Sequence, residues 1–194
     1  MKKTSILVLL VAAVVVVAWA SGAYNSMVNV QEKATTALAN VQSAYQRRAD
    51  LIPNLVNTVK GYAAHEKETL ESVVNARAKA TSINLEAGDL TPEKMKEFQA
   101  AQSELTGALG RLIAVGEAYP DLKANENFRE LQVQLEGTEN RINEARNSFN
   151  KAVQDYNVTI RRFPKNLLAG IFGFDKMVKF EAESGAEKAP EVKF

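Results

Sequence analysis

An apolar run at the N-terminus constrains this chain more than any other feature. After Lys2 and Lys3 no charged residue occurs until Glu32, and every residue from 6 to 20 is apolar. A helix needs about 20 mostly apolar residues to cross the hydrocarbon core of a bilayer, and residues 4–24 supply that length. Because cations are retained in the cytoplasm, the two lysines predict a single-pass anchor in the cytoplasmic membrane, with the bulk of the chain extracytoplasmic.

A cleavable signal peptide is the competing interpretation of the same run. Ala18-Trp19-Ala20 fits the small-residue exit motif, with Ser21 as the new N-terminus. Both interpretations carry the domain through the membrane. The sequence contains no cysteine, which excludes a lipid-modified N-terminal cysteine, disulfides and thiolate metal sites.

The length and composition of the remaining chain predict one domain that binds no nucleic acid. The 24 Lys and Arg residues balance 23 Asp and Glu residues, and the two signs alternate along the sequence without forming a basic stripe. Such interspersed charges are typical of a solvated surface.

The pattern after the apolar run is helical and close to heptad. Apolar residues recur at alternating steps of three and four, which places them on one stripe of each helix. We therefore expect an all-α fold in which an antiparallel bundle of long helices follows the transmembrane helix. Long heptad faces also permit an oligomer. The residues expected in the core include Leu105, Leu109, Leu135, Ile142 and Phe149.

Three sequence signals predict where helices begin or end. Thr91 is suited to cap a helix that begins at Pro92, and Tyr119-Pro120 and Phe163-Pro164 predict chain corners. Pro53 is ambiguous. The favoured interpretation is a break in which Asp50 caps a new helix, giving four helices that run up and down. The alternative is a kinked first helix that continues through Pro53, leaving three.

Three sequence blocks resemble the LemA family of bacterial membrane proteins. They are residues 47–56 (RRADLIPNLV) with 60–66 (KGYAAHE), residues 119–125 (YPDLKAN) with Phe128, and residues 156–164 (YNVTIRRFP). The resemblance covers most of the chain from Tyr24 onward. It implies a retained transmembrane helix in the bacterial inner membrane and a helical bundle, and it implies no reaction.

Catalytic chemistry finds little support in the sequence. His65 is the one histidine, and Thr69 stands where a zinc-peptidase helix requires its second histidine. We expect no enzyme activity, no cofactor and no metal. The leading hypothesis is a membrane-anchored interaction or scaffold protein with an envelope partner. The alternatives are a secreted binding protein after signal cleavage and an enzyme that uses only carboxylates and arginines.

Two groups of residues are candidate sites. Charged residues on or beside the apolar stripes form either internal ion pairs or a polar cavity for a ligand; they are Arg48, Glu66, Arg77, Glu139 and Arg146. A short apolar stretch near the C-terminus forms either a cap on the bundle or a docking patch for a membrane or partner; it contains Leu167, Leu168, Ile171, Phe172 and Phe174.

The expected domain organisation follows from these features. Residues 1–24 form the Lys-Lys segment and anchor, and residues 25–163 form the bundle. Residues 164–175 form the capping or membrane-proximal segment, and residues 176–194 form a mobile tail.

Overall fold

The structure is a computed structural model that describes residues 2–86, 88 and 90–181. This described part is all-helical and contains no strand, as the sequence predicts. The helices are α1 (Lys2–Tyr62), α2 (Lys67–Ser82), α3 (Pro92–Ala118), α4 (Pro120–Ala124), α5 (Glu126–Arg161) and α6 (Lys165–Phe172).

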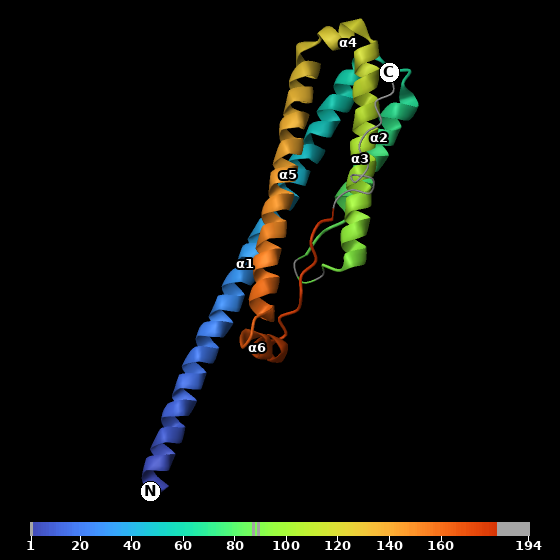
Figure 1. Cartoon of the computed structure of the whole chain (residues 1–194). Coiled ribbons are helices and arrows are strands. Elements are labelled where there is room, and N and C mark those ends of the chain that lie inside the picture. The colour runs from blue at the N-terminus through green and yellow to red at the C-terminus, as the bar shows by residue number, and fades with distance from the viewer. Residues whose placement is uncertain (1, 87, 89, 182–194) are drawn as a thin grey trace, which may run out of the picture.

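The helices pack as two pairs around a shared core (Figure 1). The second half of α1 lies along α5, and α2 packs on α3. The first part of α1 projects alone from the end of the bundle. Helix α5 runs back toward that end, where α6 contacts both α1 and α5.

The favoured break at Pro53 is wrong, because α1 continues through this residue to Tyr62. The chain instead reverses between α1 and α2, at residues 63–66. A proline inside a helix lacks the N–H that would bond the carbonyl four residues earlier, here that of Ala49. Arg77 of α2 supplies the missing donor, since its Nε lies 2.8 Å from the Ala49 oxygen. A partner from another helix therefore offsets part of the disruption that proline introduces.

The helix ends predicted around α3 are confirmed. The Thr91 hydroxyl accepts a hydrogen bond from the Lys94 N–H at 3.2 Å, and Pro92 is the first helical residue. Helix α3 ends at Ala118, and α4 begins at Pro120 after the expected corner. At the start of α5, Asn125 caps the helix by accepting from the Phe128 N–H at 3.0 Å.

The core runs the length of the bundle. All five residues singled out from the sequence are buried: Leu105, Leu109, Leu135, Ile142 and Phe149. Near α4 the packing of α3 and α5 depends on Gly116. A Cβ at this position would lie 2.1 Å from the fully buried Phe128 ring, so only glycine allows this approach without movement.

The segment after α6 extends along the bundle, which differs from the expected mobile tail. Phe180 is 5% exposed and packs against Phe98 and Phe149. The side-chain amide of Asn150 both donates to the Phe180 carbonyl and accepts from its N–H, and Asn157 does the same at Met177. Residues 176–181 are thus held by helix side chains. The rest of the expected tail lies outside the described residues.

Candidate functional site

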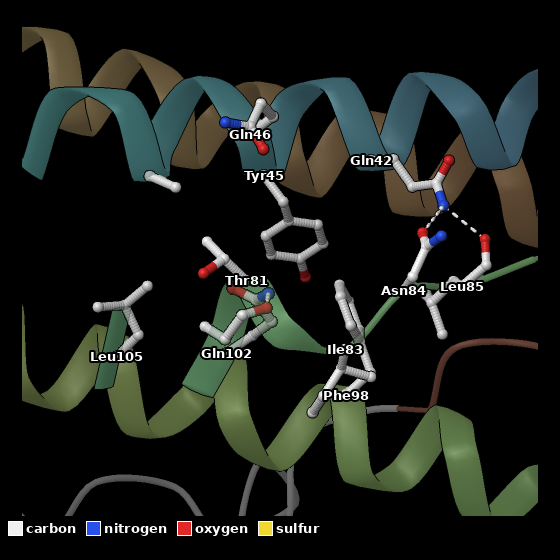
Figure 2. A pocket seen from close by; sticks show the side chains of 12 residues that line it. Gln42, Tyr45, Gln46, Thr81, Ile83, Asn84, Leu85, Phe98, Gln102 and Leu105 are labelled. Atoms are coloured by element: carbon white, nitrogen blue, oxygen red, sulfur yellow. Dashed lines mark hydrogen bonds between the residues drawn. The ribbon is translucent and has the colours of Figure 1, made fainter. Parts of the chain in front are cut away.

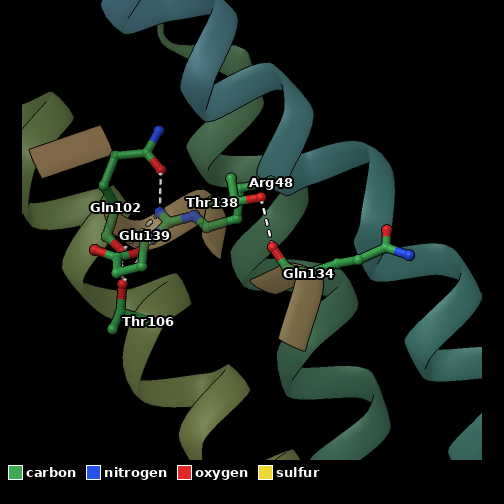
Figure 3. A network of polar contacts seen from close by, with 6 residues as sticks. All are labelled: Arg48, Gln102, Thr106, Gln134, Thr138 and Glu139. Carbon is green, nitrogen blue, oxygen red and sulfur yellow. Dashed lines mark hydrogen bonds and ion pairs between the residues drawn. The ribbon is translucent and has the colours of Figure 1, made fainter. Parts of the chain in front are cut away.

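A buried arginine joins three helices near the middle of the bundle (Figure 3). Arg48 of α1 is 3% exposed, and its Nη1 lies 2.9 Å from Oε2 of Glu139 on α5. The same nitrogen donates to the Thr106 hydroxyl at 3.0 Å, and Nη2 donates to the Gln102 side-chain oxygen at 2.6 Å, both on α3. The guanidinium carbon also lies 5.3 Å from the centre of the Tyr45 ring.

This network fixes the position of α1 relative to α3 and α5. Burying an arginine requires a paired charge and hydrogen bonds, and the network provides both for the terminal nitrogens. The Arg48 Nε is buried and has no hydrogen-bond partner among the described residues. Glu139 is 44% exposed, so one end of the ion pair opens to solvent.

The five charged candidates do not converge on one site. Arg48 and Glu139 bond directly, and together with Arg146 they line a small cavity. The Nη2 of Arg146 donates to the Glu181 carbonyl at 3.1 Å. Arg77 bonds the Ala49 carbonyl instead. Glu66 belongs to a separate contact at the α4 end of the bundle.

That separate contact centres on Tyr119, whose hydroxyl donates to Glu66 Oε1 at 3.0 Å and also contacts His65 Nε2. Burial raises the pKa of the Tyr119 hydroxyl, and the hydrogen bond to Glu66 acts in the same direction. The described residues hold no group of three or more histidines and acids that could bind a metal ion.

Two polar residues of the core were missed from the sequence. Gln102 is 7% exposed and Thr138 is 2% exposed. Gln102 lies on the stripe of α3, between Phe98 and Leu105, so its heptad position was a signal for burial. Thr138 lies between Leu135 and Ile142 on the stripe of α5, so its heptad position was the same kind of signal. Its hydroxyl donates to the Gln134 carbonyl of its own helix at 2.7 Å (Figure 3).

A small cavity lies between α1, α3 and the start of the α2–α3 connection (Figure 2). Its volume is about 150 Å³, below the range of about 300–1,000 Å³ typical of sites for small-molecule ligands. Gln42 partly closes it, because its amide nitrogen donates to Asn84 Oδ1 at 3.3 Å and to the Leu85 carbonyl. The size argues against a cofactor site here.

A larger groove runs between α3 and α5, beside the exposed end of the Arg48–Glu139 pair. Its volume is about 640 Å³. Both apolar side chains and charged side chains of both signs line it. The lining includes Leu109, Gly110, Ile113, Val133, Arg129, Glu136 and Glu139. Val133 also lines it and is 68% exposed.

The residues of the expected apolar patch lie at the opposite end of the bundle, on and just after α6. Leu167, Ile171 and Phe172 are exposed, whereas Leu168 and Phe174 are half-buried and pack against neighbouring helices. The patch is therefore remote from the groove and close to the projecting part of α1.

Comparisons with known proteins find relatives among magnetosome proteins and LemA proteins. Magnetosome protein MamQ of Magnetospirillum gryphiswaldense is 30% identical over 188 residues, a match that covers 87% of this chain and 68% of that protein. Magnetosome protein MamQ 2 of Paramagnetospirillum magneticum is 26% identical, with 84% and 66% covered. Protein LemA of Metamycoplasma hominis is 24% identical, with 83% and 70% covered. About a third of each relative lies outside the match.

The family assignment rests on a longer match than the three sequence blocks. The family match spans residues 37–194 and therefore includes α2 to α6 and the bundle half of α1. The apolar first part of α1 precedes the match and is long and apolar enough to cross a membrane. This protein is a membrane-associated helical protein that belongs to the LemA family.

Proposed function

We propose that this protein is a single-pass, non-enzymatic scaffold of the bacterial inner membrane. Residues 1–24 hold it in the bilayer, and residues 25–163 form a bundle on the extracytoplasmic side. The bundle binds an amphipathic helical segment of another envelope protein in the groove between α3 and α5.

The groove is the observation that carries this proposal. Helix α3 packs on α2 and α5 packs on α1, and the groove lies between these two pairs of helices. Amphipathic helices bind such grooves through apolar residues at steps of three and four, while charges at the edges set their orientation. Arg129, Glu136 and Glu139 line the groove and provide charges of both signs.

Substitutions at two glycines, one inside the groove and one outside it, can test whether the groove binds the partner. A Cβ at Gly110 or at Gly137 would meet no atom within 4 Å, so a side chain can start from either position without overlap. Only Gly110 lines the groove. A photo-crosslinking amino acid at Val133 in cells should form an adduct with a partner, and Gly110→Trp should abolish that adduct by filling the groove.

Gly137→Trp is the matched control and should leave the adduct intact. An adduct that survives Gly110→Trp would contradict the groove as the binding site. An adduct of twice the chain's mass would identify a second copy of this chain in the groove. It would contradict the proposal that the groove binds another envelope protein. Turnover of a substrate by the purified chain would contradict the non-enzymatic role.

The proposed topology has its own test. Protease added to intact spheroplasts should digest the bundle and leave cytoplasmic controls whole, because Lys2 and Lys3 hold the N-terminus in the cytoplasm. Protection until lysis would reverse the topology and place the partner in the cytoplasm. Sequencing of the mature N-terminus distinguishes a retained anchor from cleavage after Ala20.

A further inference from the structure

Helix α6 and the residue before Pro164 expose an apolar face that the described part of the chain leaves largely uncovered. This membrane-proximal face consists of Phe163, Leu167, Ile171 and Phe172, which are 80%, 59%, 74% and 52% exposed. On the opposite side of the helix Ala169 is 4% exposed and packs with Met27, Tyr156 and Ile160. The helix is thus fixed to the bundle by one side and presents apolar side chains outward with the other.

The position of α6 along α1 indicates what this face meets. The Phe172 and Phe174 rings lie 5.0 and 5.6 Å from the Tyr24 ring, between centroids, both edge to face. Lys165 Nζ donates to the Ser26 hydroxyl at 2.8 Å. Tyr24 is the last residue of the expected span, so α6 packs where α1 leaves the bilayer (Figure 1).

Aromatic residues on α1 mark the same level. Trp19 and Tyr24 are 42% and 40% exposed, whereas the large aliphatic side chains from Ile6 to Val17 are 57–70% exposed. Tryptophan and tyrosine concentrate at the boundary between hydrocarbon and headgroups. Because Tyr24 contacts the rings of Phe172 and Phe174, the end of α6 lies at the depth of this boundary.

We infer that α6 is a second membrane contact, which lies in the plane of the bilayer with its apolar face among the headgroups and upper acyl chains. The occupant of this face is the bilayer that α1 crosses. At 1.5 Å per residue the helix is about 12 Å long, too short to span but suited to lie at the interface. The exposed side chains of Arg161 and Arg162 come just before Phe163 and suit anionic headgroups.

Such a contact would set the orientation of the bundle. A single spanning helix can rotate about its axis and tilt in the bilayer, and the bundle moves with it because α1 enters the bundle without a break. A second contact beside that point restricts the tilt, so the α3–α5 groove faces a defined direction above the membrane. This inference rests on the proposed anchor.

The test uses the full chain in vesicles of phosphatidylcholine and phosphatidylglycerol. Because the sequence has no cysteine, Ile171→Cys provides one site for an environment-sensitive fluorophore. Lipids that carry a spin label near the headgroup should quench this probe several-fold more than a probe at Val74→Cys. Val74 is the control because it is also an exposed aliphatic residue, 51% exposed, on α2 away from α6.

A third probe, at Val14→Cys, separates failure of this inference from failure of the anchor. Lipids labelled deep in the acyl chain should quench it if α1 spans the bilayer. Quenching at position 14 with equal, weak quenching at 171 and 74 would leave the anchor standing and overturn the α6 contact. A probe at 171 that is blue-shifted without lipid quenching would indicate a second copy on this face and would also overturn it. Absence of quenching at position 14 would overturn the anchor.

Discussion

The two halves of α1 have similar backbones and opposite surroundings. In the first half the large aliphatic side chains point in all directions and stay exposed from Ile6 to Val17. In the second half one stripe is buried, at intervals of seven residues: Met27, Ala34, Val41, Arg48 and Leu55. The first half is suited to lipid and the second to a protein core on one side and water on the other. One continuous helix therefore carries two side-chain patterns, and the change between them falls between Val17 and Met27.

Removal of the first half should have the largest effect on location and little effect on folding. A chain that begins at residue 25 should leave the membrane fraction entirely after an alkaline wash, because the α6 contact alone is too small to hold it. Circular dichroism at neutral pH should still show a cooperative helical melt. A chain that stays in the washed membranes would show that the bundle half carries the anchor.

Replacing a leucine by alanine should affect the stability of the bundle very differently in the two halves of α1, which is the next largest effect. Leu55 is 0% exposed in the core, so Leu55→Ala should lower the free energy of unfolding by about 2–5 kcal/mol. Leu10 is 59% exposed, and Leu10→Ala should change the unfolding of the bundle by less than about 0.5 kcal/mol. Denaturant titration in detergent measures both. Equal losses would mean that the first half packs against the bundle.

Replacing a glycine by alanine should change the stability of the bundle little in the projecting part of α1 and considerably in the core. A Cβ at Gly22 meets no atom within 4 Å, so Gly22→Ala should be neutral or slightly stabilising. A Cβ at Gly116 would overlap the Phe128 ring, and Gly116→Ala should destabilise the bundle by about 1–3 kcal/mol. Thermal melts of the two variants provide the comparison. A neutral Gly116→Ala would mean that α3 and α5 separate easily.

The smallest expected effect concerns the proline of the second half. Arg77→Met should cost about 1–2 kcal/mol, because the Ala49 carbonyl loses its donor. In a Pro53→Ala background the restored N–H bonds that carbonyl, and the cost of Arg77→Met should fall by roughly 0.5–1.5 kcal/mol. A double-mutant cycle measures this coupling. Additive effects would show that Arg77 acts elsewhere.

Much of the fold could be predicted because its signals are local. The apolar run, the heptad stripes and the Thr91-Pro92 helix start depend on residues within one or two turns of each other. The candidate site was predicted in part. Arg48 and Glu139 were singled out by their positions on or beside a stripe, but their pairing across 91 residues was not predictable from those positions.

The sequence by itself determined that this protein is an apolar helix followed by helices with one buried face each, because side-chain periodicity follows directly from helix geometry. Only the tertiary structure decided where the helices end and what their surfaces meet. The Ala49 carbonyl, which Pro53 leaves without a donor inside α1, is bonded by Arg77 of α2. Residues 177 and 180 are held because two asparagines of α5 face their backbone. Likewise, α6 lies beside Tyr24 because α5 returns the chain to the start of the bundle. Each of these depends on atoms distant in sequence that meet after folding, and no local pattern records that meeting.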